Sequence, residues 1–236
     1  MNAPWWEDTL VGFDLETTGV DPREDRIVTA SIVIDTPGAD VVLMDWLVNP
    51  GVDIPEGATA VHGVTTEQAQ AEGQDAAEAV AQIVAKLAGF HVDDPACIPV
   101  PVVVFNASYD LTMLAAEAAR HSIGHTTPFP VVDPLVCDKA QDRYRKGKRT
   151  LGAMCEHYGV RLDDAHTSHA DALAAIGVAR AIGRTHGYPP RLHQRQVEWK
   201  AEQAAGLQEY FRRTKDPTAV VEPGWPVLPL TQGVPA

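Results

Sequence analysis

The chain has 236 residues, of which 45% are hydrophobic and 22% are charged, and a formal net charge of −13. This length suits one core-forming domain with an appendage. The excess of acids argues against a protein that coats nucleic acid non-specifically, because such binding neutralises many phosphates with Lys and Arg.

The cysteine spacing and the hydropathy of the chain exclude further classes of protein. Cys97, Cys137 and Cys155 are widely separated and form no Cys-x-x-Cys, so neither a disulfide framework nor a thiolate zinc site is indicated. Residues 1–10 lack the basic and apolar regions of a signal peptide, and no run reaches the roughly 20 apolar residues that span a bilayer. We expect a cytoplasmic protein with no membrane partner.

The first predicted element is a buried strand over residues 11–19, in which apolar residues alternate with Asp14 and Glu16. A period of two sends both carboxylates to the same side, roughly 6 to 7 Å apart at the backbone. Like charges at about 4 Å repel by on the order of 4 kcal/mol at a dielectric near 20, and no cation lies nearby in the sequence. The pattern predicts a metal site. The alternative is one solvated acid and one that caps the turn at Gly19.

The next elements predict an α/β fold. Strands over 26–34 and 41–48 complete an antiparallel meander. Thr65 and Gln68 have the spacing of a capping box, so a helix begins there, and Gly73 interrupts it. The segments that follow are a helix over 76–87, a loop over 91–99, a strand over 100–105 and a helix that Asn106 opens and that runs to Arg120.

The second half continues with short elements. We predict a strand at 131–132, helices over 135–143 and 150–157, a loop over 161–167, and an alanine-rich helix over 168–182 whose apolar face includes Leu173, Ile176 and Val178.

Tyr188-Pro189-Pro190 marks a boundary between residues 1–187 and a C-terminal part, 188–236. That part is expected to hold a helix over 191–213 that packs through Trp199, Leu207, Tyr210 and Phe211, and a Pro-rich tail that is extended or disordered and loosely attached. The alternative is a tail that docks on the domain or on a partner through Trp225, Val227, Leu228 and Leu230.

Two more acids lie where helices begin. Asp110 follows Asn106 by four residues, one helical turn, after a predicted strand. Asp171 follows His166 by five residues, in or near the first turn of the next helix. Each acid alone is typical of a residue that stabilises a helix N-terminus. The three segments together are a more specific signal.

In this order, Phe13-Asp14-Leu15-Glu16-Thr17-Thr18-Gly19, Asn106-x-x-x-Asp110 and His166-x-x-x-x-Asp171 resemble the three motifs of the DEDDh 3′→5′ exonucleases. That family includes the proofreading epsilon subunit of bacterial DNA polymerase III, RNase T and oligoribonuclease. His62-Gly63-Val64-Thr65 and the segment 148–155 resemble further parts of the family, and the resemblance covers roughly residues 10–184. It implies a ribonuclease-H-like α/β fold, a five-stranded mixed sheet flanked by helices. The C-terminal helix and extended tail would be added to this fold.

The resemblance also implies the roles of individual residues. Asp14, Glu16, Asp110 and Asp171 would hold two Mg²⁺ or Mn²⁺ ions. His166 would be the general base, since residue 167 is Thr and the related tyrosine subclass has Tyr there; His169 is a weaker candidate. The residues expected beside the terminal nucleotide are Thr17, Thr18, His62, Asn106 and Tyr109, although turn formation or packing would explain each of them equally well.

The implied function is removal of nucleoside 5′-monophosphates from the 3′ end of single-stranded nucleic acid, with DNA the expected substrate, by a two-metal mechanism. A basic cluster would guide the strand or form a solvated helix end: Lys139, Arg143, Arg145, Lys146, Lys148 and Arg149. A DNA polymerase or other replication protein is a candidate partner. The alternatives are an RNA-trimming exoribonuclease, a non-catalytic polymerase-associated module that docks through residues 191–236, and a phosphohydrolase of free nucleotides.

Overall fold

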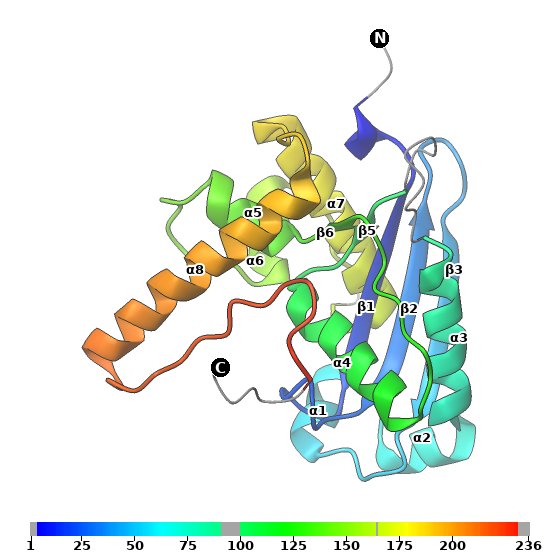
Figure 1. Ribbon diagram of the computed structural model, residues 1–236. Helices are drawn as coiled ribbons and strands as arrows, with labels where there is room; N and C mark the ends of the chain where they lie inside the picture. Colours follow the sequence, from blue (N-terminus) through cyan, green and yellow to red (C-terminus); the bar gives the residue numbers. More distant parts are fainter. Residues whose placement is uncertain (1–3, 91–99, 164, 231–236) are drawn as a thin grey trace.

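The computed structural model describes residues 4–90, 100–163 and 165–230 (Figure 1). Its centre is a mixed six-stranded sheet in the order β4-β3-β2-β1-β5-β6. Neighbouring strands among β1, β2 and β3 are antiparallel, whereas β5 is parallel to β1 and β6 is parallel to β5. The strands are β1 (Leu10–Thr17), β2 (Ile27–Asp35), β3 (Val42–Asn49), β4 (Gln74–Asp75), β5 (Val102–Val103) and β6 (Val131–Val132).

The predicted α/β class, with a mixed sheet whose first three strands form an antiparallel meander, is confirmed. The prediction of five strands was one too few, because β4 pairs with β3 through only two residues, too few to show a periodicity. Strand β5 is shorter than the predicted 100–105. The loop expected over 91–99, with Cys97, lies outside the described residues.

The described part of the chain contains eight α-helices and a 3-10 helix, η1. Thr65 caps α2 as expected, and its hydroxyl accepts the Gln68 N–H at 3.2 Å. None of the helices in the described ranges has both the length and the hydrophobicity needed to cross a membrane. The elements are η1 (Trp5–Glu7), α1 (Glu56–His62), α2 (Thr66–Glu72), α3 (Ala76–Ala88), α4 (Ala107–Arg120), α5 (Pro134–Gln141), α6 (Leu151–Tyr158), α7 (Ser168–His186) and α8 (Leu192–Thr214).

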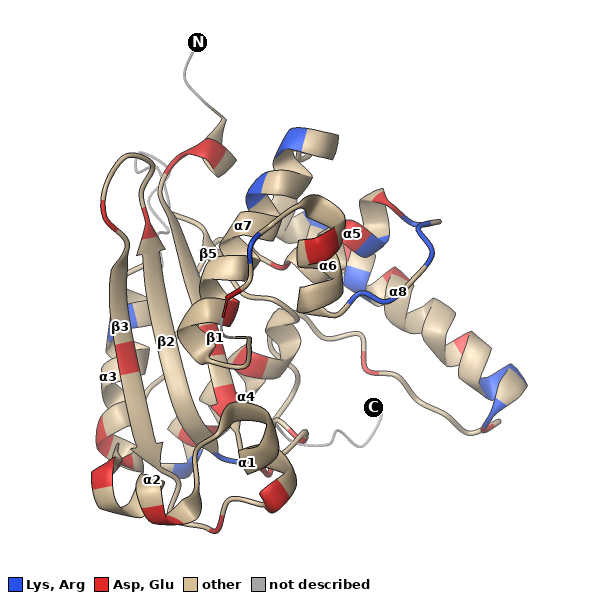
Figure 2. Cartoon of the chain, turned by 180° about the vertical axis from the view of Figure 1, so that it is seen from behind, with Lys and Arg blue, Asp and Glu red and all other residues tan. Residues whose placement is uncertain are grey.

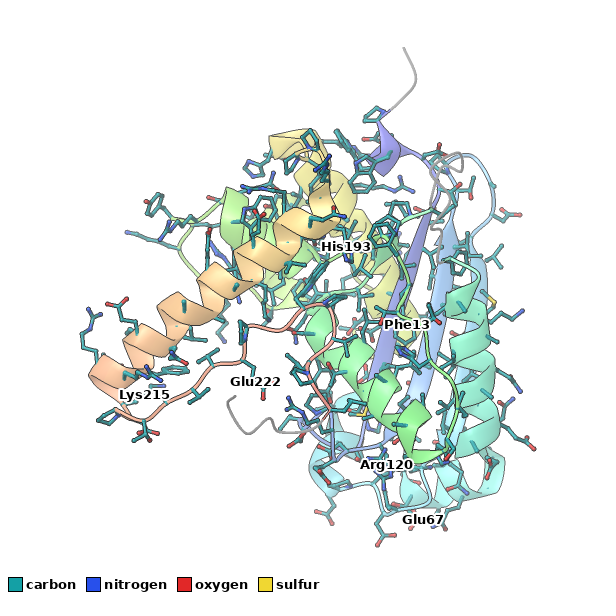
Figure 3. All side chains as sticks on the ribbon, viewed as in Figure 1. Phe13, Glu67, Arg120, His193, Lys215 and Glu222 are labelled. Atoms are coloured by element: carbon teal, nitrogen blue, oxygen red, sulfur yellow. The ribbon has the colours of Figure 1, made fainter. Side chains whose placement is uncertain are left out.

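Strand β1 separates two layers of helices. Phe13 packs in the core on the side of α3 and α4 (Figures 1 and 3). Gly12 faces α7, where a Cβ atom at residue 12 would lie 2.7 Å from the carbonyl oxygen of Ala172. The missing side chain therefore lets α7 approach β1 closely. Asp14 and Glu16 alternate with Phe13, so they share the α7 side of the strand with Gly12.

The close approach also explains one wrong expectation about α7. Leu173, predicted on the apolar face, is 41% exposed. Small side chains such as Ala172 and Ala175 fill the contact with the sheet instead, with Ile176 beside them. Residue 173 is about 100° further around the helix from residue 172, so its side chain points away.

Helix α8 packs on α5 and β6 and then extends beyond the domain (Figure 1). Leu192, Gln196 and Ala204 are buried. Leu207 and Tyr210, which were expected to pack, are 43% and 47% exposed. The prediction was wrong for these two residues because the outer half of the helix has less of the domain beside it.

The expectation of a loosely attached tail was also wrong. Trp225 is only 6% exposed, and its Nε1–H donates to Asp133 Oδ2 at 3.2 Å. The Leu228 N–H donates to Thr112 Oγ1 of α4 at 2.8 Å, and Glu222 of the tail (Figure 3) forms an ion pair with Arg23. The segment is extended, as predicted, but it is docked. The division at residues 187 and 188 into an exonuclease domain and a C-terminal part stays a prediction.

Candidate active site

Three carboxylates meet between β1 and the first turn of α7. One oxygen each from Asp14, Glu16 and Asp171 lies within 4.8 Å of the other two. Two of these residues share one face of a strand, and the third is brought to them by the contact between α7 and Gly12. Oxygen ligands at this spacing suit a hard divalent cation.

Asp110 joins this group from the opposite layer. It lies in the first turn of α4 and is 4% exposed, and its Oδ1 accepts the backbone N–H of Leu15 at 3.1 Å. Leu15 stands between Asp14 and Glu16 in β1, so this hydrogen bond ties the fourth acid to the same strand. The structure thus brings together the four acids that the three motifs contain.

The four carboxyl groups are electrostatically strained. Burial, followed by the charges of Asp110 and Asp171, raises the pKa of Asp14 well above its ordinary value. Burial also raises the pKa of Asp110 and of Asp171, and together with the charge of Asp171 it raises the pKa of Glu16 to about 7.

No Lys or Arg within the described ranges forms an ion pair with any of these four acids. A bound divalent cation would supply the missing positive charge and would favour the ionised carboxylates. The donor set and its electrostatics therefore fit the metals that the sequence predicted.

His166 lies on the loop before α7. Its backbone has φ 70°, its N–H donates to Asp171 Oδ1 at 3.4 Å, and its side chain is exposed. The residue lines a pocket of about 280 Å³ that also reaches Glu16 and His62. His169 lines the same pocket from α7. His166 is distinguished by its backbone hydrogen bond to a carboxylate of the acidic group.

A sequence profile of the exonuclease family named RNase T matches residues 11–179. The chain belongs to this family. It is 31% identical over 171 residues to a DNA polymerase III subunit epsilon-like protein of Rhodobacter capsulatus, and 28% identical over 169 residues to the PolC-type DNA polymerase III of Streptococcus thermophilus. These alignments include 70% and 71% of this chain but only 22% and 11% of the relatives, so the chain spans a small part of their length.

Solved structures of exonuclease I share the fold. The Escherichia coli enzyme in complex with a dT13 oligonucleotide matches with a TM-score of 0.59 at 19% identity, over 80% of this chain and 43% of that one. The complex of the same enzyme with a dA16 oligonucleotide matches with a TM-score of 0.61 at 18% identity, over 85% of this chain and 45% of that one. The family match and these folds agree with the DEDDh exonuclease resemblance.

In this exonuclease fold, Thr17 and Tyr109 lie at the edge of the acidic group. Their hydroxyl oxygens are 2.6 Å apart, and Tyr109 Oη donates to the carbonyl oxygen of Gly19 at 2.5 Å. Thr18 is used differently, because its buried hydroxyl accepts the Arg26 N–H and donates to Asp25 Oδ1, each at 3.0 Å. The hydroxyl of Thr18 therefore belongs to the turn.

His62 ends α1 and points into the pocket with His166. Its Nδ1 accepts the Val64 N–H at 3.2 Å, and its Nε2 is buried without a hydrogen-bond partner in the described structure. Burial lowers the pKa of His62, against an opposing effect of the Thr17 backbone. An imidazole that lines this pocket is suited to contact a polar ligand.

Sequence reasoning missed the role of Asp133. Asn106 directly precedes α4, as predicted, with φ 61°, a left-handed conformation that Asn tolerates, but its side chain makes no capping hydrogen bond. The Asp133 carboxylate accepts the N–H groups of Asn106 and Ala107 at 3.1 and 3.0 Å instead. Asp133 thereby anchors the turn that carries Asp110.

A polar row under the pocket was also missed. Ser31 of β2 lies opposite Asp14, and its Oγ is 2.7 Å from Ser168 Oγ and donates to Asp45 Oδ1 at 2.6 Å. These hydrogen bonds attach the start of α7, and hence the segment between His166 and Asp171, to the sheet. The one signal in the sequence was a serine within a strand of β-branched residues.

Proposed function

We propose that this protein is a 3′→5′ exonuclease that removes nucleoside 5′-monophosphates from the 3′ end of single-stranded DNA. The observation that carries the proposal is the group of carboxylates around Asp14, which the protein brings together and leaves without a cation of its own. A site of this kind fits the hydrolysis of a phosphodiester, whose negative charge needs compensation as the bond breaks.

Asp14, Glu16, Asp110 and Asp171 would hold two Mg²⁺ or Mn²⁺ ions. Such cations, when bound, activate water and stabilise the charge on the phosphate and on the leaving 3′ oxygen. The contribution of the protein is the placement of hard oxygen ligands, since β1 supplies two acids from one face and two helix starts supply the others.

His166 would act as the general base. A neutral imidazole accepts a proton near neutral pH, and an exposed loop position gives this side chain access to water at the pocket. The hydrogen bond from its backbone to Asp171 keeps the loop next to the acidic group.

The pocket residues would orient the terminal nucleotide. Thr17 and Tyr109 form hydrogen bonds with each other and with Gly19 at the edge of the site, and His62 lines the pocket. Asn106, whose side chain caps no helix, is free to contact substrate there. Thr18 would support this edge through its turn rather than touch the nucleotide.

The comparisons support DNA as substrate and a polymerase as partner. The similar exonuclease I structures contain dT13 and dA16 oligonucleotides, and the relatives are named as parts of DNA polymerase III. We therefore propose that the protein acts in DNA replication or repair in the cytoplasm, together with a polymerase or another replication protein.

Digestion of end-labelled strands tests the proposal. Single-stranded and double-stranded DNA and RNA are incubated with Mg²⁺ or Mn²⁺, with Asp14→Asn as the control. We expect a ladder of products shortened from the 3′ end on single-stranded DNA, and none with the variant. Faster trimming of RNA would assign an exoribonuclease instead. Absence of any hydrolysis, together with no metal binding by calorimetry, would leave a non-catalytic module.

A further inference from the structure

A groove of about 490 Å³ lies between α5, with the loop that follows it, and the outer half of α8. Lys139 and Arg143 line one side, and Trp199, Leu207 and Tyr210 line the other. Helix α8 lies beyond residues 11–179, the part that matches the exonuclease family. The groove therefore combines the family fold with a helix that follows the matched segment in this chain.

Two of the three cations that line the groove have no ion-pair partner within the described ranges, whereas the third, Arg149, pairs with Asp138. Lys139 and Arg143 are exposed, and neither forms an ion pair with another residue of the described ranges. Partial burial of the side chain and then the charge of Lys200 lower the pKa of Lys139, against the opposing charges of Asp133 and Asp138. The ammonium groups of Lys139 and Lys200 are therefore close enough to repel each other. Glu202 is the acid among the lining residues. Unpaired cations gathered in a chain of net charge −13 favour a polyanion as ligand.

The wall formed by α8 adds exposed apolar surface. Leu207 and Tyr210 follow Trp199 on one stripe of the helix, and both are more than two-fifths exposed. An exposed aromatic ring beside cations is the combination on which successive bases of a single strand stack. Leu207 and Tyr210, which were predicted to pack in the core, thus supply an exposed surface for a flat ligand.

Lys200 of α8 links the groove to the turn that carries Asp110. Lys200 follows Trp199 on α8, and its Nζ donates to Ser108 Oγ at 3.1 Å. Ser108 precedes Tyr109 and Asp110 in the first turn of α4. Figure 2 shows Lys and Arg on the loop after α5 beside α8, with Asp and Glu on β1 and α7. Lys200 therefore adds a cation between Lys139 of the groove and the helix turn that carries Asp110.

We propose that this groove binds single-stranded DNA upstream of the terminal nucleotide, with phosphates at Lys139 and Arg143 and a base on Tyr210. The inference rests on the proposed exonuclease function and names the surface that holds the rest of the substrate. It predicts that the groove contributes to the binding of long strands and not to that of a dinucleotide, which the acidic site accommodates alone.

The test measures strand binding separately from hydrolysis. The double variant Lys139→Gln/Arg143→Gln and the variant Tyr210→Ala are compared with Lys86→Gln, which removes an exposed charge from α3 on another side of the molecule. All are made on an Asp14→Asn background. Anisotropy of labelled oligo(dT) of about 12 nucleotides, within the site sizes known for single-strand binding, is recorded with Mg²⁺ at several salt concentrations. A labelled dinucleotide is the short probe.

For the double variant we expect the slope of log affinity against log salt to fall by about 1.4, the value for two lost phosphate contacts to a single strand. Tyr210→Ala should weaken binding of the long probe on the order of tenfold. The affinity of every variant for the dinucleotide should stay within about twofold of that of the Asp14→Asn parent. The affinity of the Lys86→Gln control for the long probe should do the same, because a twofold change is smaller than the effect of one lost stacking contact. Thermal unfolding checks that every variant is folded.

An unchanged affinity and salt slope for the long probe would overturn the groove assignment, including the case in which the groove serves a protein partner. Parallel digestion by the wild-type chain separates this failure from that of the function. If the wild-type chain shortens strands from the 3′ end and the groove variants bind the long probe normally, only the proposal about the groove is wrong. A wild-type chain that neither binds nor shortens strands removes the proposed function as well.

Discussion

The charge of Asp138 and the charges of the acids around Asp14 are compensated in opposite ways. Asp138 of α5 is fully buried, and Arg145 and Arg149 pair with it at 2.8 and 2.9 Å while Tyr158 Oη donates to it at 2.8 Å. The acids around Asp14 have no such partners within the described ranges, and burial together with like charges raises the pKa of Asp14. One carboxylate is neutralised by the chain, and the other group needs a cation from solution.

This difference in charge compensation distinguishes an acid with a structural role from acids with a functional role. A buried charge is tolerated where hydrogen bonds and counter-ions compensate its lost hydration, and Asp138 meets that condition. The Asp14 group breaks the rule at a cost in stability, which is typical of functional sites. Two residues of the predicted basic cluster therefore have a structural role. Arg145 and Arg149 form ion pairs with Asp138 and are not free to guide a strand.

The largest effect should come from Asp14→Asn. Removing one carboxylate of the group should lower the rate of 3′ hydrolysis about 10⁴-fold, equivalent to about 5.5 kcal/mol. The same change should raise the thermal stability of the metal-free protein, because it relieves repulsion with Asp110 and Asp171. Single-turnover digestion and thermal unfolding in EDTA measure the two effects. A variant that is less stable without metal would show that Asp14 is a structural acid like Asp138.

His166→Ala should reduce single-turnover hydrolysis about 10³-fold, the usual range for loss of a general base. Metal affinity should change little, because the imidazole is exposed and the Asp171 contact comes from the backbone N–H. His169→Ala is the matched control, since this residue lines the same pocket. Wild-type turnover by His166→Ala, with a loss in the control, would move the role to His169.

Asp138→Asn should lower the free energy of unfolding by about 3 kcal/mol, because Arg149 loses the carboxylate it pairs with and Arg145 keeps only Asp142, at 3.6 Å. Denaturant unfolding measures this loss. Metal affinity of the folded variant, followed by calorimetry, should match that of the wild type. A stability close to that of the wild type would remove the contrast between the two groups of acids.

Trp225→Phe tests a third way of compensating a buried carboxylate, that of Asp133, which accepts hydrogen bonds from N–H groups. The substitution keeps an aromatic ring and removes the donor to Asp133, so it should cost about 1.5 kcal/mol of unfolding free energy, as for a hydrogen bond to a charged group. Trp5→Phe, at a partly buried stack with Tyr188, is the control for the change of ring. An equal effect of both substitutions would assign the cost to packing alone.

The smallest expected effect is on pH dependence, because Glu16 is partly open to solvent. Its pKa in the folded chain is about 7, raised from an ordinary value of 4.5. Between these values the folded state holds a proton that the unfolded state has lost, so the stability of the metal-free protein should fall as pH rises from about 4.5 to about 7. Thermal unfolding in EDTA follows this trend, and Glu16→Gln should reduce it. A trend of equal size in that variant would assign it to other groups.

Much of the candidate site could be predicted from sequence because its components are local. The period of two in β1 places Asp14 and Glu16 on one face, and the helix starts after residues 106 and 167 place Asp110 and Asp171 in first turns. The start and end of helices such as α6, which begins after Thr150 and ends at Gly159 with φ 66°, follow from capping chemistry of neighbouring residues.

What the sequence by itself determined about this protein was therefore the kind of each element and the side on which its acids lie, since backbone geometry alone sets those periods. Only the tertiary structure decided which separate segments meet. Gly12 brings α7 onto β1, Asp133 anchors α4, Trp225 docks the tail, and Tyr210 is left exposed on α8. Each depends on the packing of residues far apart in the chain, which no local pattern specifies.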